Sequence, residues 1–223
     1  MKFPLLHNAV ELENVVLEIG FLPFFRNEIQ GYSVEECTPP GYWFTDVEGP
    51  WEWKGTIARG RRIAYAKLFG GKAGYVSPDW YPDLANYRRS GMDFNDRYQE
   101  GLASRKDKEV VDMLRKSGPS LSVDLKRLGN YGPAGNKGFE TVITRLQMQT
   151  YITVQDFAYK QDKFGQPYGW GIARYALSED WLGEELVTAA YGCSPEDSRD
   201  SMARHLKTLL PHAAEKQIER LIR

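Results

Sequence analysis

Apolar residues recur at helical spacing in the stretch from Phe139 to about Gln147. Side chains at positions i, i+3, i+4 and i+7 share one face of a helix, and here these positions are Phe139, Val142, Ile143 and Leu146. We therefore expect an amphipathic helix with these residues in the core.

The segments on either side of this helix have patterns of their own. Residues 123–128 predict a short helix, and the loop 129–138 after it contains four glycines. Residues 151–159 and 170–177 are strand-like and are separated by the polar loop 160–169. A short helix, a turn, a second helix and a hairpin, in this order, are the plan of a winged helix-turn-helix.

The first half of the chain predicts a helix from Asn8 to Ile19 and then irregular structure, rich in Pro, Gly and aromatic residues, to about residue 60. Residues 61–77 predict a hairpin that turns at Gly70-Gly71. Ser77 should then cap a helix whose first position is Pro78.

Helical patterns continue to about residue 116, and one of these helices should begin at Ser104. The C-terminal segment predicts a helix after the capping Ser194 to about Leu210. A further helix should follow Pro211 and run to Ile222.

These elements predict an α+β protein: a winged helix-turn-helix with an aromatic-rich α/β N-terminal part and a helical C-terminal tail. The three expected parts are residues 1–116, 117–182 and 183–223.

Composition narrows the class of protein. The chain has 223 residues, 42% of them hydrophobic, and no apolar run approaches the length of a transmembrane helix. The N-terminus lacks the apolar stretch of a signal peptide, so we expect a cytoplasmic protein without a membrane partner. The two cysteines and three scattered histidines match no metal-ligand spacing, so we expect neither a metal nor a cofactor.

Net charge is −1, but the charges are unevenly distributed. Residues 1–53 carry nine acidic and two basic residues, whereas residues 54–76 carry six basic residues and no acidic one. Residues 120–177 again have an excess of three positive charges. The two basic segments would suit a positive face for nucleic acid, and an ordinary mixed surface is the alternative.

A helix through residues 139–147 would turn a polar face away from the core. Such a face can contact phosphates and base edges, or it can simply be solvated. The candidate DNA-binding residues come from the basic turn, the two helices and the wing: Arg59, Arg61, Arg62, Lys126, Lys137, Thr141, Thr144, Arg145, Lys160 and Lys163. Their expected partner is double-stranded DNA.

Aromatic residues crowd together between residues 42 and 53, near Glu48 and Glu52. The rings of Trp43, Trp51 and Trp53 could stack on a base that is flipped out of the duplex. The alternative is that they pack a segment that has few aliphatic side chains.

Gln147 and Gln149 can share a task only if the chain is already extended at residue 147. Side chains at i and i+2 of a strand point to one side, whereas in a helix they point about 160° apart. A pair of glutamines on one side could orient a water molecule or hydrogen-bond a base. The alternative is that they end a helix and begin an ordinary strand.

The stretch "KGFETVITRLQMQTYITV", followed by "FGQPYGWGIARYALSEDWL", resembles the winged-helix segment of the AlkZ/YcaQ family of bacterial DNA glycosylases. The stretches "GPWEWKGTI" and "AYAKLFGGKAGYVS" resemble the Trp-containing segment of the AlkZ-related subgroup. The resemblance covers about residues 40–182.

The resemblance implies a DNA-repair protein that excises alkylated purines, including crosslinked ones, without a metal. It also implies winged-helix units around a positively charged channel. In this family a Gln-x-Gln or Gln-x-Asp motif at the start of a strand positions the attacking water, and Gln147-Met148-Gln149 has that form. In the glycosylases the motif lies near the N-terminus, whereas here it lies two-thirds along a much shorter chain.

Three classes of function therefore remain open from the sequence. The chain could be a DNA glycosylase that uses Gln147 and Gln149, or a non-catalytic winged-helix module that binds DNA or protein. It could also hold a small molecule among its tryptophans. The sequence leaves open the oligomeric state and the lesion.

Overall fold

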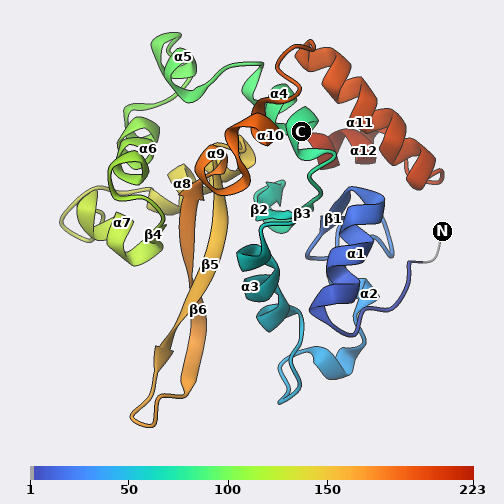
Figure 1. Ribbon diagram of the computed structural model, residues 1–223, viewed down its shortest axis with the longest axis horizontal. Helices are drawn as coiled ribbons and strands as arrows, with labels where there is room; N and C mark the ends of the chain where they lie inside the picture. Colours follow the sequence, from blue (N-terminus) through green and yellow to red (C-terminus); the bar gives the residue numbers. More distant parts are fainter. Residues whose placement is uncertain (1–2) are drawn as a thin grey trace.

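The computed structural model describes residues 3–223, apart from the side chains of Pro167 and Tyr168. The described residues form helices and two three-stranded antiparallel sheets, so the chain is an α+β protein, as expected. Figure 1 shows helices arranged around the sheets and one long hairpin that projects away from the rest of the molecule.

The N-terminal part contains a sheet with the order β1 (Phe21–Pro23), β3 (Lys72–Val76) and β2 (Ala64–Phe69). Helix α1 (Ala9–Ile19) precedes it, and its Asn8 cap accepts a hydrogen bond from the Glu11 N–H. The predicted first helix and the predicted hairpin are therefore confirmed. Gly70 and Gly71 form its turn with φ of 58° and 79°, a conformation that glycine adopts without strain.

Residues 20–60 are more regular than the sequence predicted. They contain two short helical segments, α2 (Val34–Cys37) and η1 (Pro40–Tyr42), and a full helix α3 (Pro50–Gly60). Helix α3 starts with a proline in its first turn, and the Glu52 side chain accepts a hydrogen bond from the Gly49 N–H at 2.9 Å. The prediction of irregular structure was wrong here because Gly55 and Thr56 interrupt the apolar pattern.

Helix α4 (Tyr81–Arg89) begins later than predicted. The Ser77 main-chain oxygen accepts hydrogen bonds from the N–H groups of Trp80 and Tyr81, at 3.2 and 2.9 Å, and so closes a turn before the helix. Pro82 rather than Pro78 therefore lies in the first helical turn. The prediction was wrong because a serine followed by a proline can begin a single turn that ends before a helix starts.

Helices α5 (Phe94–Gln99) and α6 (Arg105–Ser117) follow. Ser104 caps α6, as predicted, and its hydroxyl accepts a hydrogen bond from the Asp107 N–H.

The middle part follows the predicted order with one additional strand. A two-residue strand, β4 (Ser120–Leu121), lies directly before α7 (Ser122–Leu128). Helix α8 (Phe139–Met148) comes next, and its predicted apolar face is buried. Strand β4 was missed because two residues are too few for an alternating pattern.

The hairpin of β5 (Ile152–Gln161) and β6 (Pro167–Leu177) completes the second sheet, whose strand order is β4-β6-β5. Pairing runs from Ile152 opposite Leu177 to Gln161 opposite Pro167. Figure 1 shows that this hairpin extends beside α3 and reaches toward the same side of the molecule as the loop after η1.

The C-terminal helices are α9 (Ser178–Leu182), α10 (Glu184–Thr188), α11 (Pro195–Leu209) and α12 (Glu215–Ile222). Ser194 caps α11, as predicted. Helix α11 packs on α4, and α12 packs on α11. Buried hydrophobic residues from Leu6 to Ile222 form one core cluster, so all three expected parts contribute to it.

Arg88 on α4 connects these parts through the main chain. Its guanidinium donates hydrogen bonds to the carbonyl oxygens of Leu68, Met148 and Ile222, at 2.6, 3.0 and 3.0 Å. No described helix is long and apolar enough to cross a membrane.

Candidate functional site

Gln147 lies inside the protein. Its side chain is 1% exposed, and its Nε2 donates a hydrogen bond to the Ile143 carbonyl oxygen at 3.1 Å. Its Oε1 accepts a hydrogen bond from the Lys67 main-chain N–H on β2 at 3.0 Å. The amide of Gln147 therefore joins α8 to the N-terminal sheet, with both ends occupied by the main chain.

Gln149 lies elsewhere. Helix α8 continues through Met148, and Gln149 is its C-cap. Thr150 then turns the chain with a φ of 62°, so strand β5 starts only at Ile152. Because the chain is helical at residue 147, the alternation of a strand does not apply, and the two glutamine side chains do not converge.

The side chain of Gln149 borders an open groove of about 600 Å³ along the outer face of α8. Thr141, Thr144, Arg145 and Met148 also line this groove. Part of the predicted DNA-binding face is therefore accessible.

Several candidate DNA-binding side chains of this region have partners inside the protein. Arg145 donates to both carboxylate oxygens of the buried Asp107, with the shortest contact at 2.6 Å. Lys126 pairs with Glu140 at 2.8 Å. The Lys137 ammonium donates to the carbonyl oxygens of Gly132 and Pro133.

Thr144 is also engaged. Its hydroxyl accepts a hydrogen bond from the Lys67 ammonium at 3.2 Å. A Cβ atom added to Gly71 would lie 3.4 Å from the methyl carbon of Thr144, so the β2–β3 turn packs against this side of α8. Thr141, the other candidate threonine of α8, is exposed.

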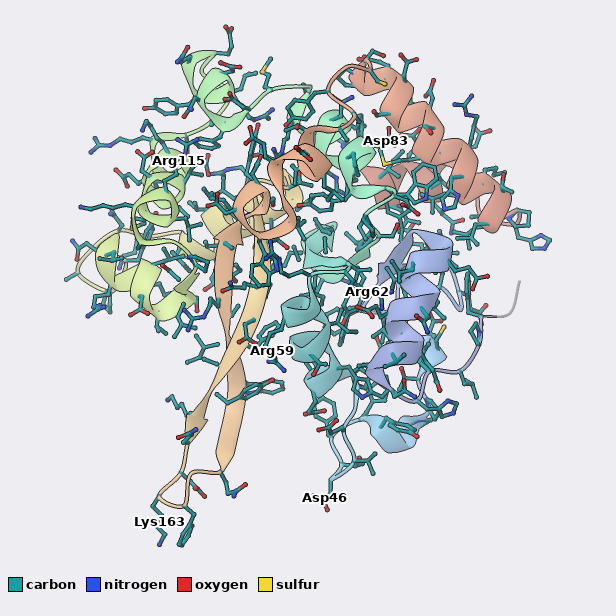
Figure 2. All side chains as sticks on the ribbon, viewed as in Figure 1. Asp46, Arg59, Arg62, Asp83, Arg115 and Lys163 are labelled. Atoms are coloured by element: carbon teal, nitrogen blue, oxygen red, sulfur yellow. The ribbon has the colours of Figure 1, made fainter. Side chains whose placement is uncertain are left out.

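The arginines at the end of α3 and in the turn after it also have partners inside the protein. Arg59 pairs with Asp156 of β5 at 2.7 Å, and Arg62 pairs with Glu13 of α1 at 2.6 Å. Arg61 donates to the Trp181 carbonyl oxygen at 2.7 Å and lies 4.5 Å from the Trp181 ring. Figure 2 shows Arg59 between α3 and the hairpin, where it contributes to holding the two together.

Lys160 and Lys163 are the exposed cations of the β5–β6 hairpin. Neither makes an ion pair with a residue in the described part of the chain. Lys163 stands at the hairpin tip (Figure 2). These are the candidate DNA-binding lysines with the greatest freedom to meet a phosphate.

The three candidate stacking tryptophans have different environments. Trp53 is 3% exposed, and its Nε1 donates to the Glu48 carbonyl oxygen at 3.1 Å, so it belongs to the core. Trp43 and Trp51 are half-buried, with ring centroids 6.2 Å apart and nearly perpendicular planes. Both line a cavity of about 470 Å³, called the aromatic cavity below.

The aromatic cavity also contains polar groups without partners. Its walls include the rings of Phe25 and Phe44 and the side chain of Thr38. The Thr38 Oγ1 and the Trp51 Nε1 are buried without a hydrogen-bond partner in the described part of the chain.

A second cavity lies on the other side of Phe44 and Trp51. It has a volume of about 310 Å³ and is also lined by Lys54, Tyr159 and Trp170. Trp170 of β6 meets Trp51 edge-to-face with ring centroids 5.6 Å apart. This space is called the lysine cavity below.

Lys54 is a buried lysine, with 6% of it exposed. Its Nζ lies 4.2 Å from the ring centroid of Trp51 and 4.5 Å from that of Phe157. Burial lowers the pKa of the Lys54 ammonium to about 8, against the opposing effect of the Glu52 carboxylate.

The model of AlkZ-related proteins matches residues 6–223, nearly the whole chain. The chain belongs to the AlkZ-related family. No curated protein and no solved structure matches it. The match confirms the family resemblance and extends it beyond residues 40–182.

Sequence reasoning missed three residues of the two cavities in this AlkZ-related protein: Thr38, Lys54 and Trp170. Lys54 directly follows the aromatic segment, but its burial depends on Phe157 from the distant β5. Trp170 is one of the exposed large hydrophobic side chains of β6, at 73% exposure.

In the described part of this AlkZ-related chain, no group of three or more His, Cys, Asp and Glu residues could hold a metal ion.

Proposed function

We propose that this AlkZ-related protein binds double-stranded DNA and holds an extruded, alkylated purine in the aromatic cavity. The observation that carries this proposal is the aromatic lining of the cavity, where Trp43, Phe44 and Trp51 border a volume of about 470 Å³. Membership of the family supports a role related to DNA repair.

The chemistry of a purine matches the aromatic cavity. Its flat rings can pack against Trp43, Phe44 and Trp51, and its ring nitrogens and exocyclic oxygen can accept hydrogen bonds. A cavity of about 470 Å³ is within the range of small-molecule sites.

An alkylated purine that carries a positive charge would gain further contacts. Aromatic faces attract cations, and the cavity is bordered by Glu35 and Glu36. Glu36 accepts hydrogen bonds from the Gly31 N–H and the Ser33 hydroxyl, so this carboxylate is fixed in place. Arg26 also lines the cavity and pairs with Glu35 at 3.6 Å, so Glu36 is the carboxylate that would favour a cationic base over its neutral counterpart.

We further propose that residues 117–182 are a winged helix-turn-helix whose wing is the β5–β6 hairpin. The order of α7, α8 and the hairpin, with β4 as the third strand of the sheet, supports this assignment. Lys160 and Lys163 would contact phosphates from the wing, and Thr141 would face the duplex from α8. The wing and the aromatic cavity meet at Trp170 and Trp51, so DNA on the wing could deliver a base nearby.

Hydrolysis through a glutamine pair is the less favoured function. The Gln147 amide is buried and hydrogen-bonded to the main chain at both ends, which leaves Gln149 to orient water alone. Base excision remains the second candidate because Gln149 borders the accessible groove of α8.

Binding of plain duplex DNA and of the same duplex with one alkylated purine would test the proposal. Fluorescence anisotropy at two salt concentrations would report affinity, and release of the free base would report excision. We expect salt-dependent binding, a preference for the alkylated duplex and no base release.

No binding to either duplex at low salt would overturn the proposal. If the unchanged protein releases the free base and Gln149→Ala does not, base excision is the function, and binding without catalysis is ruled out. Equal binding of both duplexes would remove the aromatic cavity from the proposed function.

A further inference from the structure

We infer that Lys54 is a nucleophilic amine that forms an imine with the aldehyde of an abasic deoxyribose in the lysine cavity. This inference rests on the proposed DNA binding, because DNA would bring the aldehyde to the cavity. It assigns to Lys54 a covalent chemistry that is independent of Gln147 and Gln149.

The surroundings of Lys54 differ from those of the other buried cations. Arg88 and Arg89 are held by several hydrogen bonds each, to main-chain oxygens and, for Arg89, to the Glu179 carboxylate. In contrast, the Lys54 Nζ has no hydrogen bond or ion pair with any group that the structure describes, and its neighbours are the rings of Trp51 and Phe157. The ring contacts favour the charged ammonium, against the effect of burial, and no hydrogen bond to a described group occupies the lone pair when the amine is neutral.

Protonation also favours this role. The pKa of about 8 leaves roughly one tenth of Lys54 uncharged at pH 7, whereas an exposed lysine is almost fully protonated. Lysines are activated as nucleophiles when an apolar pocket desolvates them in this way. The Glu52 carboxylate lines the same cavity and raises the pKa of Lys54, so the lowered pKa reflects burial acting against this carboxylate.

The lysine cavity can admit a sugar. Its volume is about 310 Å³, and Gly169 and Gly171 of the wing form part of its lining. A Cβ at Gly171 would lie about 3.0 Å from the Tyr159 ring, so glycine keeps the hairpin close to this ring. Burial raises the pKa of the Tyr159 phenol, which therefore stays protonated and can donate a hydrogen bond to a carbonyl oxygen.

The reaction balances without any further reagent. The Lys54 lone pair attacks the aldehyde carbon, and the carbonyl electron pair takes up a proton to give a carbinolamine. Loss of the hydroxyl group as water then gives the imine. One amine and one aldehyde therefore yield one imine and one water molecule, with no oxidation or reduction.

Reductive trapping would test the inference. The full-length protein would be incubated with a duplex that contains one abasic site, in the presence of cyanoborohydride, which converts an imine to a stable secondary amine. We expect a covalent protein–DNA species on a denaturing gel and attachment at Lys54 by peptide mapping.

The variant Lys54→Arg keeps a cation but removes the nucleophilic amine, and we expect at least a tenfold loss of adduct. Lys67→Arg is the matched control, because Lys67 is another partly buried lysine outside this cavity. It should form adduct like the unchanged protein. Thermal melting would verify that both variants are folded.

A parallel incubation with glycolaldehyde separates a free aldehyde from a DNA aldehyde. Modification of Lys54 by glycolaldehyde, without an adduct on abasic DNA, would overturn the assignment to DNA. Normal DNA binding without an adduct at Lys54 would overturn the inference and leave the proposed function intact. Absence of DNA binding would overturn the proposed function itself.

Discussion

The Gln147 side chain on α8 accepts a hydrogen bond from the Lys67 main-chain N–H on β2 at 3.0 Å. The same amide donates to the Ile143 carbonyl oxygen within its own helix. A residue that the sequence proposed for chemistry therefore joins the helix of the middle part to the N-terminal sheet.

Gln147→Ala should lower the free energy of unfolding by about 1–3 kcal/mol, because the Lys67 N–H would remain buried without an acceptor. Urea denaturation measures this change. Gln149→Ala is the control and should stay within about 0.5 kcal/mol of the unchanged protein, since its side chain is partly exposed. A stable Gln147→Ala protein that fails to bind DNA would contradict the structural role.

Arg145→Gln should affect stability more than DNA binding. Arg145 forms a forked pair with Asp107, whose buried carboxylate would lose its partner at a cost of about 1–3 kcal/mol. Urea denaturation and the salt dependence of DNA affinity measure the two effects separately. A shallower salt dependence with unchanged stability would show that Arg145 contacts phosphate instead.

Replacing Lys160 and Lys163 together by Gln should weaken DNA binding and make it less sensitive to salt. Each lost phosphate contact lowers the slope of log affinity against log salt by about 0.9, so two contacts give roughly 1.8. Lys216→Gln on α12 is the matched control. It changes an exposed lysine on the far side of the molecule from the β5–β6 hairpin, as Figure 1 shows for α12.

Trp51→Phe should reduce the preference for alkylated over plain DNA by about five- to tenfold, because the smaller ring loses base stacking worth roughly 1–1.5 kcal/mol. Stability should also fall, because the Trp51 ring packs against Trp43 and Trp170. Anisotropy titrations and urea denaturation measure both quantities.

Trp181→Phe provides the comparison for Trp51→Phe. The Trp181 Nε1 donates to the Ala58 carbonyl oxygen at 3.3 Å, so its loss should lower stability and leave the preference for alkylated DNA unchanged. The same loss of preference in both variants would argue against the aromatic cavity as the base site.

Lys54→Met should stabilise the protein most below pH 8. Folding lowers the pKa of Lys54 from 10.5 to about 8, so the folded state binds fewer protons than the unfolded state between these values. The stability of the unchanged protein therefore rises with pH through this window, relative to the variant. Urea denaturation at pH 7, 9 and 10.5 should show the advantage of Lys54→Met shrinking at each step.

An advantage of Lys54→Met that is the same at every pH would contradict a lowered pKa. The contacts of Lys54 with the rings of Trp51 and Phe157 favour the charged amine and work against the burial effect.

The sequence by itself determined the elements whose causes are local. Asn8, Ser104 and Ser194 cap their helices because the donor that each satisfies lies three residues away. The core face of α8 and the β2–β3 turn at Gly70-Gly71 follow from periodicity and from the conformational freedom of glycine. The family was also evident from stretches of the chain itself, and the match over residues 6–223 confirms it.

Only the tertiary structure decided which side chains are available for function. Arg59 and Arg62 are basic in the sequence, but they meet Asp156 and Glu13, which come from distant parts of the chain. The lysine cavity exists because the β5–β6 hairpin brings Trp170 against Trp51. Spacing along a helix or strand fixes the direction of a side chain, whereas its partner, burial and pKa depend on which distant elements pack against it.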